Sequence, residues 1–148
     1  MAWSIESVRK AALTPADIFG LYMDPSTWGS WAHNTRGAHA DGPLAEGSIV
    51  KVEAGYRRTW DVLVRRIDPD RFIETEVRPP GLTIVQRFEV EPTESGVRLR
   101  HEIEVSGKAA GFTRLTLKPF YQRWLEKETG RLVEFAQQRQ TGGTSADR

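Results

Sequence analysis

The chain has 148 residues, a length suited to one domain with a sizeable core or a modest internal cavity. Hydrophobic residues make up 39% and charged residues 28%, while the net charge of +1 leaves no field to hold a phosphate backbone, so nucleic acid is not expected as a partner. The absence of cysteine excludes disulfides, thiolate catalysis and cysteine-ligated zinc.

The first predicted elements are a strand and a helix. Residues Trp3 to Ala11 mix apolar and polar positions without a helical stripe, which favours a strand. The segment Thr14-Pro15-Ala16-Asp17 is typical of a helix start, with threonine as the N-cap, proline at the first helical position and an acid at the third. Pro25 ends this helix at Asp24, because the residue before a proline avoids the helical region.

A second short helical turn follows directly. Ser26 is placed to cap it, and it carries Trp28 and Trp31, whose spacing puts both indoles on one face. Two of the five tryptophans in one short turn indicate that the turn packs against the core or against the mouth of a cavity. The segment from His33 to Gly47 is rich in Gly, Ala, Asn and Asp and predicts a loop.

The middle of the chain alternates between apolar and polar residues, as half-buried strands do. The predicted strands are 50–53, 56–65, 72–78, 82–91 and 97–105. Turn-forming residues separate the later ones, as in Asp68-Pro69-Asp70-Arg71, Pro79-Pro80-Gly81 and Thr93-Glu94-Ser95-Gly96. Short hairpin connections of this kind predict an antiparallel meander with one face toward water.

From about Lys118 the apolar spacing becomes that of a long helix. Its predicted apolar stripe comprises Phe120, Tyr121, Trp124, Leu125, Leu132, Phe135 and Ala136, and its other positions include Lys127, Glu128, Arg131 and Gln138. Gly130 weakens a helix, so we expect it to make room for a group close by. We expect a single domain over residues 1–140 and a disordered tail over 141–148.

The order of these elements and motifs resembles the START-like, Bet v 1-like (SRPBCC) superfamily, and within it the small polyketide cyclase/dehydrase-type proteins. The matching segments are Thr14–Asp17, Asp24-Pro25-x-x-Trp28-x-x-Trp31, Gly42–Gly47, Asp68–Arg71 and Gly96–His101 with Val105-Ser106-Gly107. The resemblance implies an α+β helix-grip fold, in which a curved antiparallel sheet of about six to seven strands wraps a long C-terminal helix. Two short helices lie between the first and second strands, and an apolar cavity lies between sheet and helix.

The alternation places a few polar side chains on the face that would line this cavity: Tyr56, Arg58, Gln86 and His101. A buried polar group needs a hydrogen bond, so each either joins an internal network or faces a ligand. His101, Tyr56 and Arg58 are the candidates for catalysis, with His101 interpreted either as a satisfied core histidine or as a proton shuttle. A bulge near Gly55 would instead turn Arg58 outward. The full predicted cavity set is Trp28, Trp31, Tyr56, Arg58, Trp60, Gln86, Phe88, His101, Tyr121 and Trp124.

The sequence predicts neither a metal site nor a cofactor. His33, His39 and Asp41 match no common ligand spacing, and no Walker, dinucleotide-binding or nucleophile-elbow pattern is present. No apolar run approaches the roughly 20 residues of a membrane span. The first residues lack the pattern of a secretory signal, so we expect a cytoplasmic protein. The charged outer strand positions favour a monomer or weak homodimer.

Three functions remain open from the sequence. The first is non-catalytic binding of a small apolar molecule that is lipid-, polyketide- or aromatic-like. The second, which the resemblance implies, is an aromatase/cyclase or dehydrase acting on a polyketide-like substrate in the same cavity. The third is a protein-interaction or chaperone-cofactor module, which the heavily charged outer faces disfavour because they leave no apolar patch.

Overall fold

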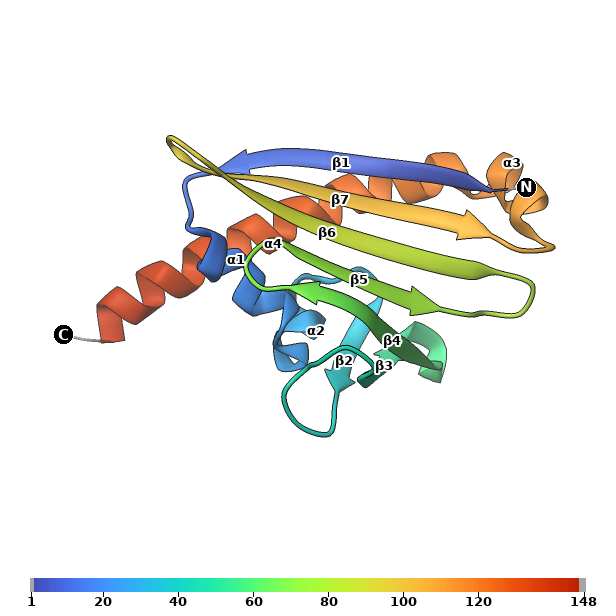
Figure 1. The fold of residues 1–148 in the computed structure, drawn as a ribbon, viewed down its shortest axis with the longest axis horizontal. Coiled ribbons are helices and arrows are strands. Elements are labelled where there is room, and N and C mark those ends of the chain that lie inside the picture. Colours follow the sequence, from blue (N-terminus) through green and yellow to red (C-terminus); the bar gives the residue numbers. More distant parts are fainter. Residues whose placement is uncertain (1, 147–148) are drawn as a thin grey trace.

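A computed structural model of the chain describes residues 2–146. Seven antiparallel strands form one sheet, with the spatial order β1-β7-β6-β5-β4-β3-β2 (Figure 1). The strands are β1 (Trp3–Ala11), β2 (Thr35–His39), β3 (Ile49–Ala54), β4 (Thr59–Asp68), β5 (Phe72–Val77), β6 (Thr83–Thr93) and β7 (Gly96–Ser106). Every consecutive pair from β2 to β7 is an antiparallel neighbour, and β1 closes the other edge by pairing with β7.

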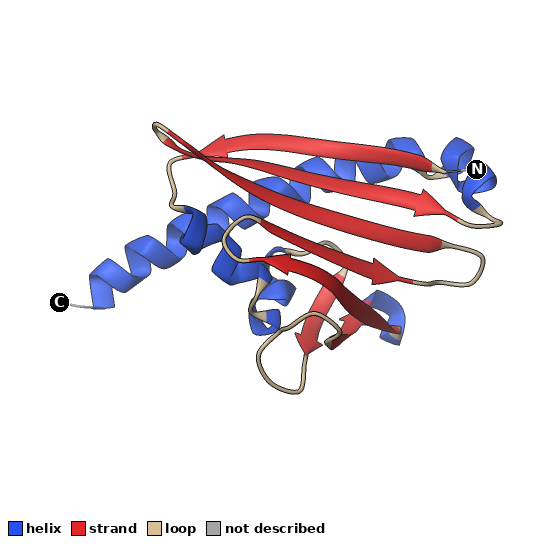
Figure 2. Cartoon of the chain, viewed as in Figure 1, coloured by secondary structure: helices blue, strands red, loops and turns tan. Residues whose placement is uncertain are grey.

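The helical elements are α1 (Pro15–Tyr22), the 3-10 turn η1 (Pro25–Thr27), α2 (Trp28–Trp31), the 3-10 turn η2 (Gly55–Arg57), α3 (Ala110–Thr116) and α4 (Lys118–Ala146). Helices α1, α2 and α4 lie on one face of this sheet, and α3 and η2 lie at its ends (Figure 2). The long helix α4 crosses behind the sheet, and its C-terminal end extends past the sheet edge (Figure 1). The predicted α+β helix-grip architecture, with short helices after the first strand, is confirmed.

Local sequence signals explain how the helix pair forms. Thr14 and Asp17 make the predicted capping box, in which each side chain accepts the other residue's backbone N–H at 3.2 Å. The second turn is capped by Asp24 rather than by the predicted Ser26, because the Asp24 carboxylate accepts the Ser26 backbone N–H at 3.1 Å. The chain therefore bends sharply between α1 and α2, which holds both tryptophans of α2 against the sheet.

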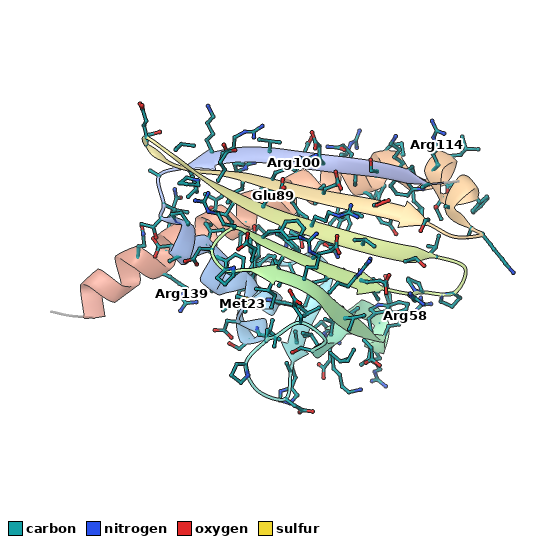
Figure 3. All side chains as sticks on the ribbon, viewed as in Figure 1. Met23, Arg58, Glu89, Arg100, Arg114 and Arg139 are labelled. Carbon is teal, nitrogen blue, oxygen red and sulfur yellow. The ribbon has the colours of Figure 1, made fainter. Side chains whose placement is uncertain are left out.

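The alternation of the central strands sorts side chains onto two faces as predicted. On the outer face, Arg100 contacts Glu6 of β1 at 2.7 Å and Glu89 of β6 at 3.0 Å, and the last pair can be followed in Figure 3. Arg87 contacts Glu74 at 2.7 Å on the same face. These cross-strand ion pairs lie where the sequence predicted a charged, solvated sheet surface.

Two segments differ from their predictions. The predicted loop from His33 to Gly47 contains the edge strand β2, which packs so closely on α2 that a Cβ on Gly29 would lie 2.7 Å from the Arg36 carbonyl oxygen. The predicted strand over 56–65 begins only at Thr59. Tyr56 adopts φ 59° and Arg57 φ 58°, a left-handed conformation that ends β3 and forms the turn η2.

The C-terminal helix passes close to β1. A Cβ on Gly130 would lie 3.3 Å from the guanidinium of Arg9, so the predicted close neighbour of this glycine is that side chain. The backbone of α4 is helical to Ala146, through most of the predicted tail, while residues 147–148 lie outside the described part of the chain. None of the described helices combines the length and apolar character that a membrane span requires.

Candidate functional site

A cavity of about 580 Å³ lies between the inner face of the sheet, the α2–β2 segment and the first half of α4. Apolar and aromatic side chains dominate its wall, and they include Trp28, Trp31, Val52, Trp60, Val62, Ile73, Leu82, Ile84, Phe88, Ile103, Tyr121 and Trp124. A volume of this size lies within the range of roughly 300–1,000 Å³ found for small-molecule sites.

The mouth of the cavity lies at the end of the sheet that carries η2 and the start of α4. Arg58, Pro80 and Phe120 line the cavity and are exposed, so they form its rim. Arg58 directly follows η2, and Figure 3 shows it at the same end of the molecule as Arg114 of α3, with Met23 and Arg139 toward the other end. The bulge that would have removed Arg58 from the cavity is replaced by η2, which leaves Arg58 at the rim.

Glu128 of α4 is the acidic group of the cavity wall. Its side chain is buried, and its Oε1 accepts the backbone N–H of His33 at 3.2 Å. The other oxygen, Oε2, is buried without a hydrogen-bond partner. Burial raises the pKa of Glu128 to about 7, against the opposing effects of the His33 N–H and the Arg131 charge. Near neutral pH the group therefore exchanges readily between carboxyl and carboxylate.

His101 stands behind the cavity wall and supports it. Its Nε2 lies 2.9 Å from the Gln86 Oε1, and its ring lies 3.9 Å from the ring of Phe88. The Nδ1 atom is 3.7 Å from Glu128 Oε2, beyond hydrogen-bond length. Burial lowers the pKa of His101 to about 3, so the ring is neutral. When Nε2 donates to Gln86, the Nδ1 lone pair is the one nearer to Glu128 Oε2.

Two further polar residues, Tyr22 and His33, lie close to Glu128. Tyr22 lies in the wall, and burial together with the nearby Glu128 charge raises the pKa of its hydroxyl above the ordinary value. His33 packs edge-on against Trp124 with ring centroids 4.7 Å apart, and burial lowers its pKa to about 3. Neither group carries a positive charge at neutral pH, so neither offsets the burial that raises the pKa of Glu128.

Three tryptophans of the wall differ in what their indole N–H groups contact. Trp28 donates to the Tyr22 carbonyl at 3.1 Å, and Trp31 donates to the Thr27 hydroxyl at 3.0 Å. Trp124 Nε1 is buried and has no partner. Among the described residues, Trp124 Nε1 and Glu128 Oε2 are the two buried side-chain polar atoms left without a hydrogen bond. Both stand on one face of α4, four residues apart, and both residues line the cavity.

The structure brings most of the predicted cavity residues together. Those that line the cavity as predicted are Trp28, Trp31, Arg58, Trp60, Gln86, Phe88, Tyr121 and Trp124. His101 touches the wall from behind without lining it. Tyr56 lies outside the site and is 96% exposed, because η2 turns it away from the strand face to which the alternation had assigned it.

Sequence reasoning missed Glu128, His33 and Tyr22 as site residues. The signal for Glu128 was present, because it follows Tyr121 by seven residues and Trp124 by four, the spacing of one helix face. It was instead assigned to the solvent side of the helix. For His33 no sequence signal exists, since its position depends on β2 turning back along α2.

The described residues hold no group of three or more side chains suited to bind a metal ion. His33 and His39 differ in their environments, since His33 is half-buried against Trp124 while His39 is exposed and lies 3.6 Å from Asp41. Among the described residues, His33, His39 and Asp41 therefore do not form a metal site.

Sequence comparison now adds to this geometry. Residues 2–136 match a family model described as "Polyketide cyclase / dehydrase and lipid transport". The chain belongs to this family. The resemblance to small polyketide cyclase/dehydrase-type proteins, stated from the sequence, is thereby confirmed. The comparison with curated protein sequences gives no match.

Solved structures show where else this family's fold occurs. Norcoclaurine synthase from Thalictrum flavum, in complex with dopamine and hydroxybenzaldehyde, is similar with a TM-score of 0.71 at 12% identity, over 93% of this chain and 88% of that chain. A START superfamily protein from Mycobacterium smegmatis is similar with a TM-score of 0.71 at 16% identity, over 91% of this chain and 97% of that chain. The di-domain ARO/CYC StfQ from the steffimycin biosynthetic pathway gives 0.73 at 13% identity, over 95% of this chain and 52% of that chain.

Proposed function

We propose that the protein binds a small, mainly apolar molecule that carries a hydroxyl or carbonyl group, with this polar group held between Trp124 and Glu128. The observation that carries the proposal is the pair of unpartnered buried atoms, Trp124 Nε1 and Glu128 Oε2, on two residues that line a mainly apolar cavity. Leaving a buried polar atom unpaired costs about 1–3 kcal/mol, and native proteins rarely keep two together without a use.

The chemistry of the two atoms defines the polar group of the ligand. An indole N–H only donates, so the ligand must offer an oxygen acceptor there. Glu128 with a pKa near 7 either donates from its carboxyl form or accepts in its carboxylate form. A hydroxyl group satisfies both neighbours at once, and a carbonyl does so when Glu128 is protonated. The aromatic wall around them, with Phe88, Trp60 and Tyr121, favours a flat or ring-containing body.

Matched pairs of ligands test this proposal. Each pair consists of an aromatic alcohol and the analogue with methyl in place of hydroxyl, such as β-naphthol and β-methylnaphthalene, and affinities are measured by isothermal titration calorimetry. One hydrogen bond to a waiting partner contributes about 1 kcal/mol, so the hydroxyl compounds should bind roughly fivefold more tightly. Equal affinity within each pair, across several ring systems, would show that the two polar atoms do not recognise a ligand.

A second function, catalysis, is favoured by the protonation behaviour of Glu128. A carboxyl group with a pKa near 7 that faces a cavity suits general acid–base chemistry. In a dehydration, Glu128 would give its proton to a leaving hydroxyl, which departs as water. The resulting carboxylate would take a proton from the neighbouring carbon, and this restores the carboxyl group and leaves a double bond. His101 would act as a positioning residue for Glu128 in this scheme.

Dehydration of a β-hydroxy ketone with a phenyl substituent distinguishes the two functions, because the conjugated product is followed by its ultraviolet absorbance. A dehydrase should lose turnover by on the order of 100-fold in Glu128→Gln, and its rate should fall as the pH rises past about 7. Binding of β-naphthol without turnover of several such ketones would leave the carrier function standing alone.

A further inference from the structure

Large apolar side chains are exposed beside the mouth of the cavity. Phe112 and Leu115 of α3 are 72% and 83% exposed, and Phe120 at the start of α4 is 62% exposed. Phe112 and Leu115 are three residues apart and share one face of α3. The opposite face of α3 is anchored, because the Trp3 indole donates to the Ala110 carbonyl at 2.9 Å. The exposed apolar face is therefore presented outward by a fixed helix.

The segment of the chain that carries these side chains contains charged residues of one sign only. Between Glu104 and Glu126 the sequence contains Lys108, Arg114, Lys118 and Arg123 and no acidic residue. The chain as a whole is almost balanced, with 21 basic and 20 acidic residues. We call this region, formed by Phe112, Leu115, Phe120 and the four basic residues, the mouth surface.

The mouth surface is continuous with the cavity. Phe120 belongs both to it and to the cavity wall. Arg58 also lines the cavity and is exposed. Figure 3 shows Arg58 and Arg114 at the same end of the molecule. An apolar ligand that leaves the cavity here passes between aromatic and basic side chains rather than directly into water.

We infer that the mouth surface docks on an anionic lipid bilayer, and that the cavity exchanges its ligand with that bilayer. Apolar side chains that enter the headgroup region, flanked by basic residues, are the features that hold peripheral proteins on negatively charged membranes. A second copy of the chain is a poor occupant, because a twofold contact would set the basic residues of one copy against those of the other.

Flotation with vesicles tests the docking without any cavity ligand. Vesicles of phosphatidylcholine with phosphatidylglycerol should carry the protein, and vesicles of phosphatidylcholine alone should carry much less. Phe112→Ser with Leu115→Ser removes the apolar contact, and Lys108→Glu with Lys118→Glu reverses charge. Each double variant should lower the partition coefficient roughly tenfold or more.

Matched control variants lie elsewhere on the molecule. Val8 and Ile49 are also exposed apolar residues, at 42% and 46%, and neither lines the cavity. Val8→Ser with Ile49→Ser, and Lys10→Glu with Lys51→Glu, should float like the wild type. Circular dichroism shows whether each variant folds. If Phe112→Ser with Leu115→Ser does not fold, Lys108→Glu with Lys118→Glu still tests the inference.

Three results would overturn the inference. The first is a wild-type protein that does not float with anionic vesicles. The second is flotation that the mouth-surface variants leave unchanged. The third is self-association in analytical ultracentrifugation that the same variants abolish while vesicle binding is absent, since a second copy would then cover the surface. None of these results depends on whether Trp124 and Glu128 recognise a hydroxyl group.

Discussion

The tryptophan turn at α2 and the Trp124–Glu128 face of α4 both carry aromatic side chains that line the cavity, but they differ in whether their polar atoms are hydrogen-bonded. The turn satisfies its own polar groups, because the indoles of Trp28 and Trp31 donate to Tyr22 and Thr27. The α4 face leaves Trp124 Nε1 and Glu128 Oε2 unpaired in the same cavity. The complete hydrogen bonds of the turn stabilise the fold, whereas the two unpaired atoms of the α4 face are the ones that we propose a ligand satisfies.

The largest expected effect on stability belongs to the turn. Trp31 is 3% exposed and packs edge-on against Tyr22 and Phe88, so Trp31→Ala should lower the free energy of unfolding by about 3–5 kcal/mol. Trp124→Ala should cost less than half of that, because its side chain is half-buried and borders an existing hollow. Urea denaturation of both variants measures the difference, and equal losses would erase the distinction between the two regions.

The pH dependence of stability separates Glu128 from the rest of the site. Burial raises its pKa from the ordinary 4.5 to about 7, so between these values the folded protein holds a proton that the unfolded chain has released. The stability due to that proton is lost as the pH rises through this interval. The lowered pKa values of His33 and His101 act in the opposite direction, since stability rises as the unfolded histidines lose their protons.

The variant Glu128→Gln isolates the carboxyl group, because both histidines remain. Relative to the wild type it should gain stability as the pH rises from 5 to 8, by about 2–3 kcal/mol, because most of the interval between the unfolded and folded pKa values of Glu128 lies in this range. Glu134→Gln, at an exposed position on the same helix, should show no such trend. A flat difference for both variants would place Glu128 in a solvated environment.

The smallest effect is the most specific one. Trp28→Phe removes a donor that Tyr22 uses, and should destabilise the protein by about 1 kcal/mol while leaving the preference for β-naphthol over β-methylnaphthalene intact. Trp124→Phe removes a donor with no partner, so it should leave stability within about 0.5 kcal/mol and abolish most of that preference. Urea denaturation measures the stability of both variants, and calorimetry measures their ligand preference. A stability loss in Trp124→Phe together with a lost preference in Trp28→Phe would contradict the distinction between the two regions.

The parts of the fold that the sequence predicts are those fixed by local sequence patterns, and the parts it misses depend on contacts between segments or on a change in backbone conformation. Strands β6 and β7 were predicted because one face is apolar and the other charged, a pattern visible in the sequence from Ile84 to Val105. Strand β2 was not, because it is a short edge strand whose placement rests on the close contact of Gly29 with Arg36. Tyr56 was misplaced because a left-handed turn reverses a strand face without any change in composition.

The site was predictable in its walls and not in its chemistry. The aromatic lining followed from the apolar faces of strands and helix, and eight of the ten predicted residues line the cavity. Glu128 was missed because a glutamate on a long helix is by default assigned to solvent. Only the surrounding Tyr22, His33 and His101, which come from three other elements, show that this one is buried.

The pairing of β1 with β7 sets the order in which the molecule can be assembled. The indole of Trp3 donates to the Ala110 carbonyl, 107 residues further along the chain, and the one strand that pairs with β1 among residues 2–146 is β7. Contacts of such long sequence separation slow folding, because the intervening chain must be organised before they form. The meander from β3 to β6 has its local hairpins available much earlier. Helix α4, which packs along β1 and carries Trp124 and Glu128, follows all seven strands in the chain. The wall of the cavity that these two residues form is therefore completed only after every strand has been synthesised.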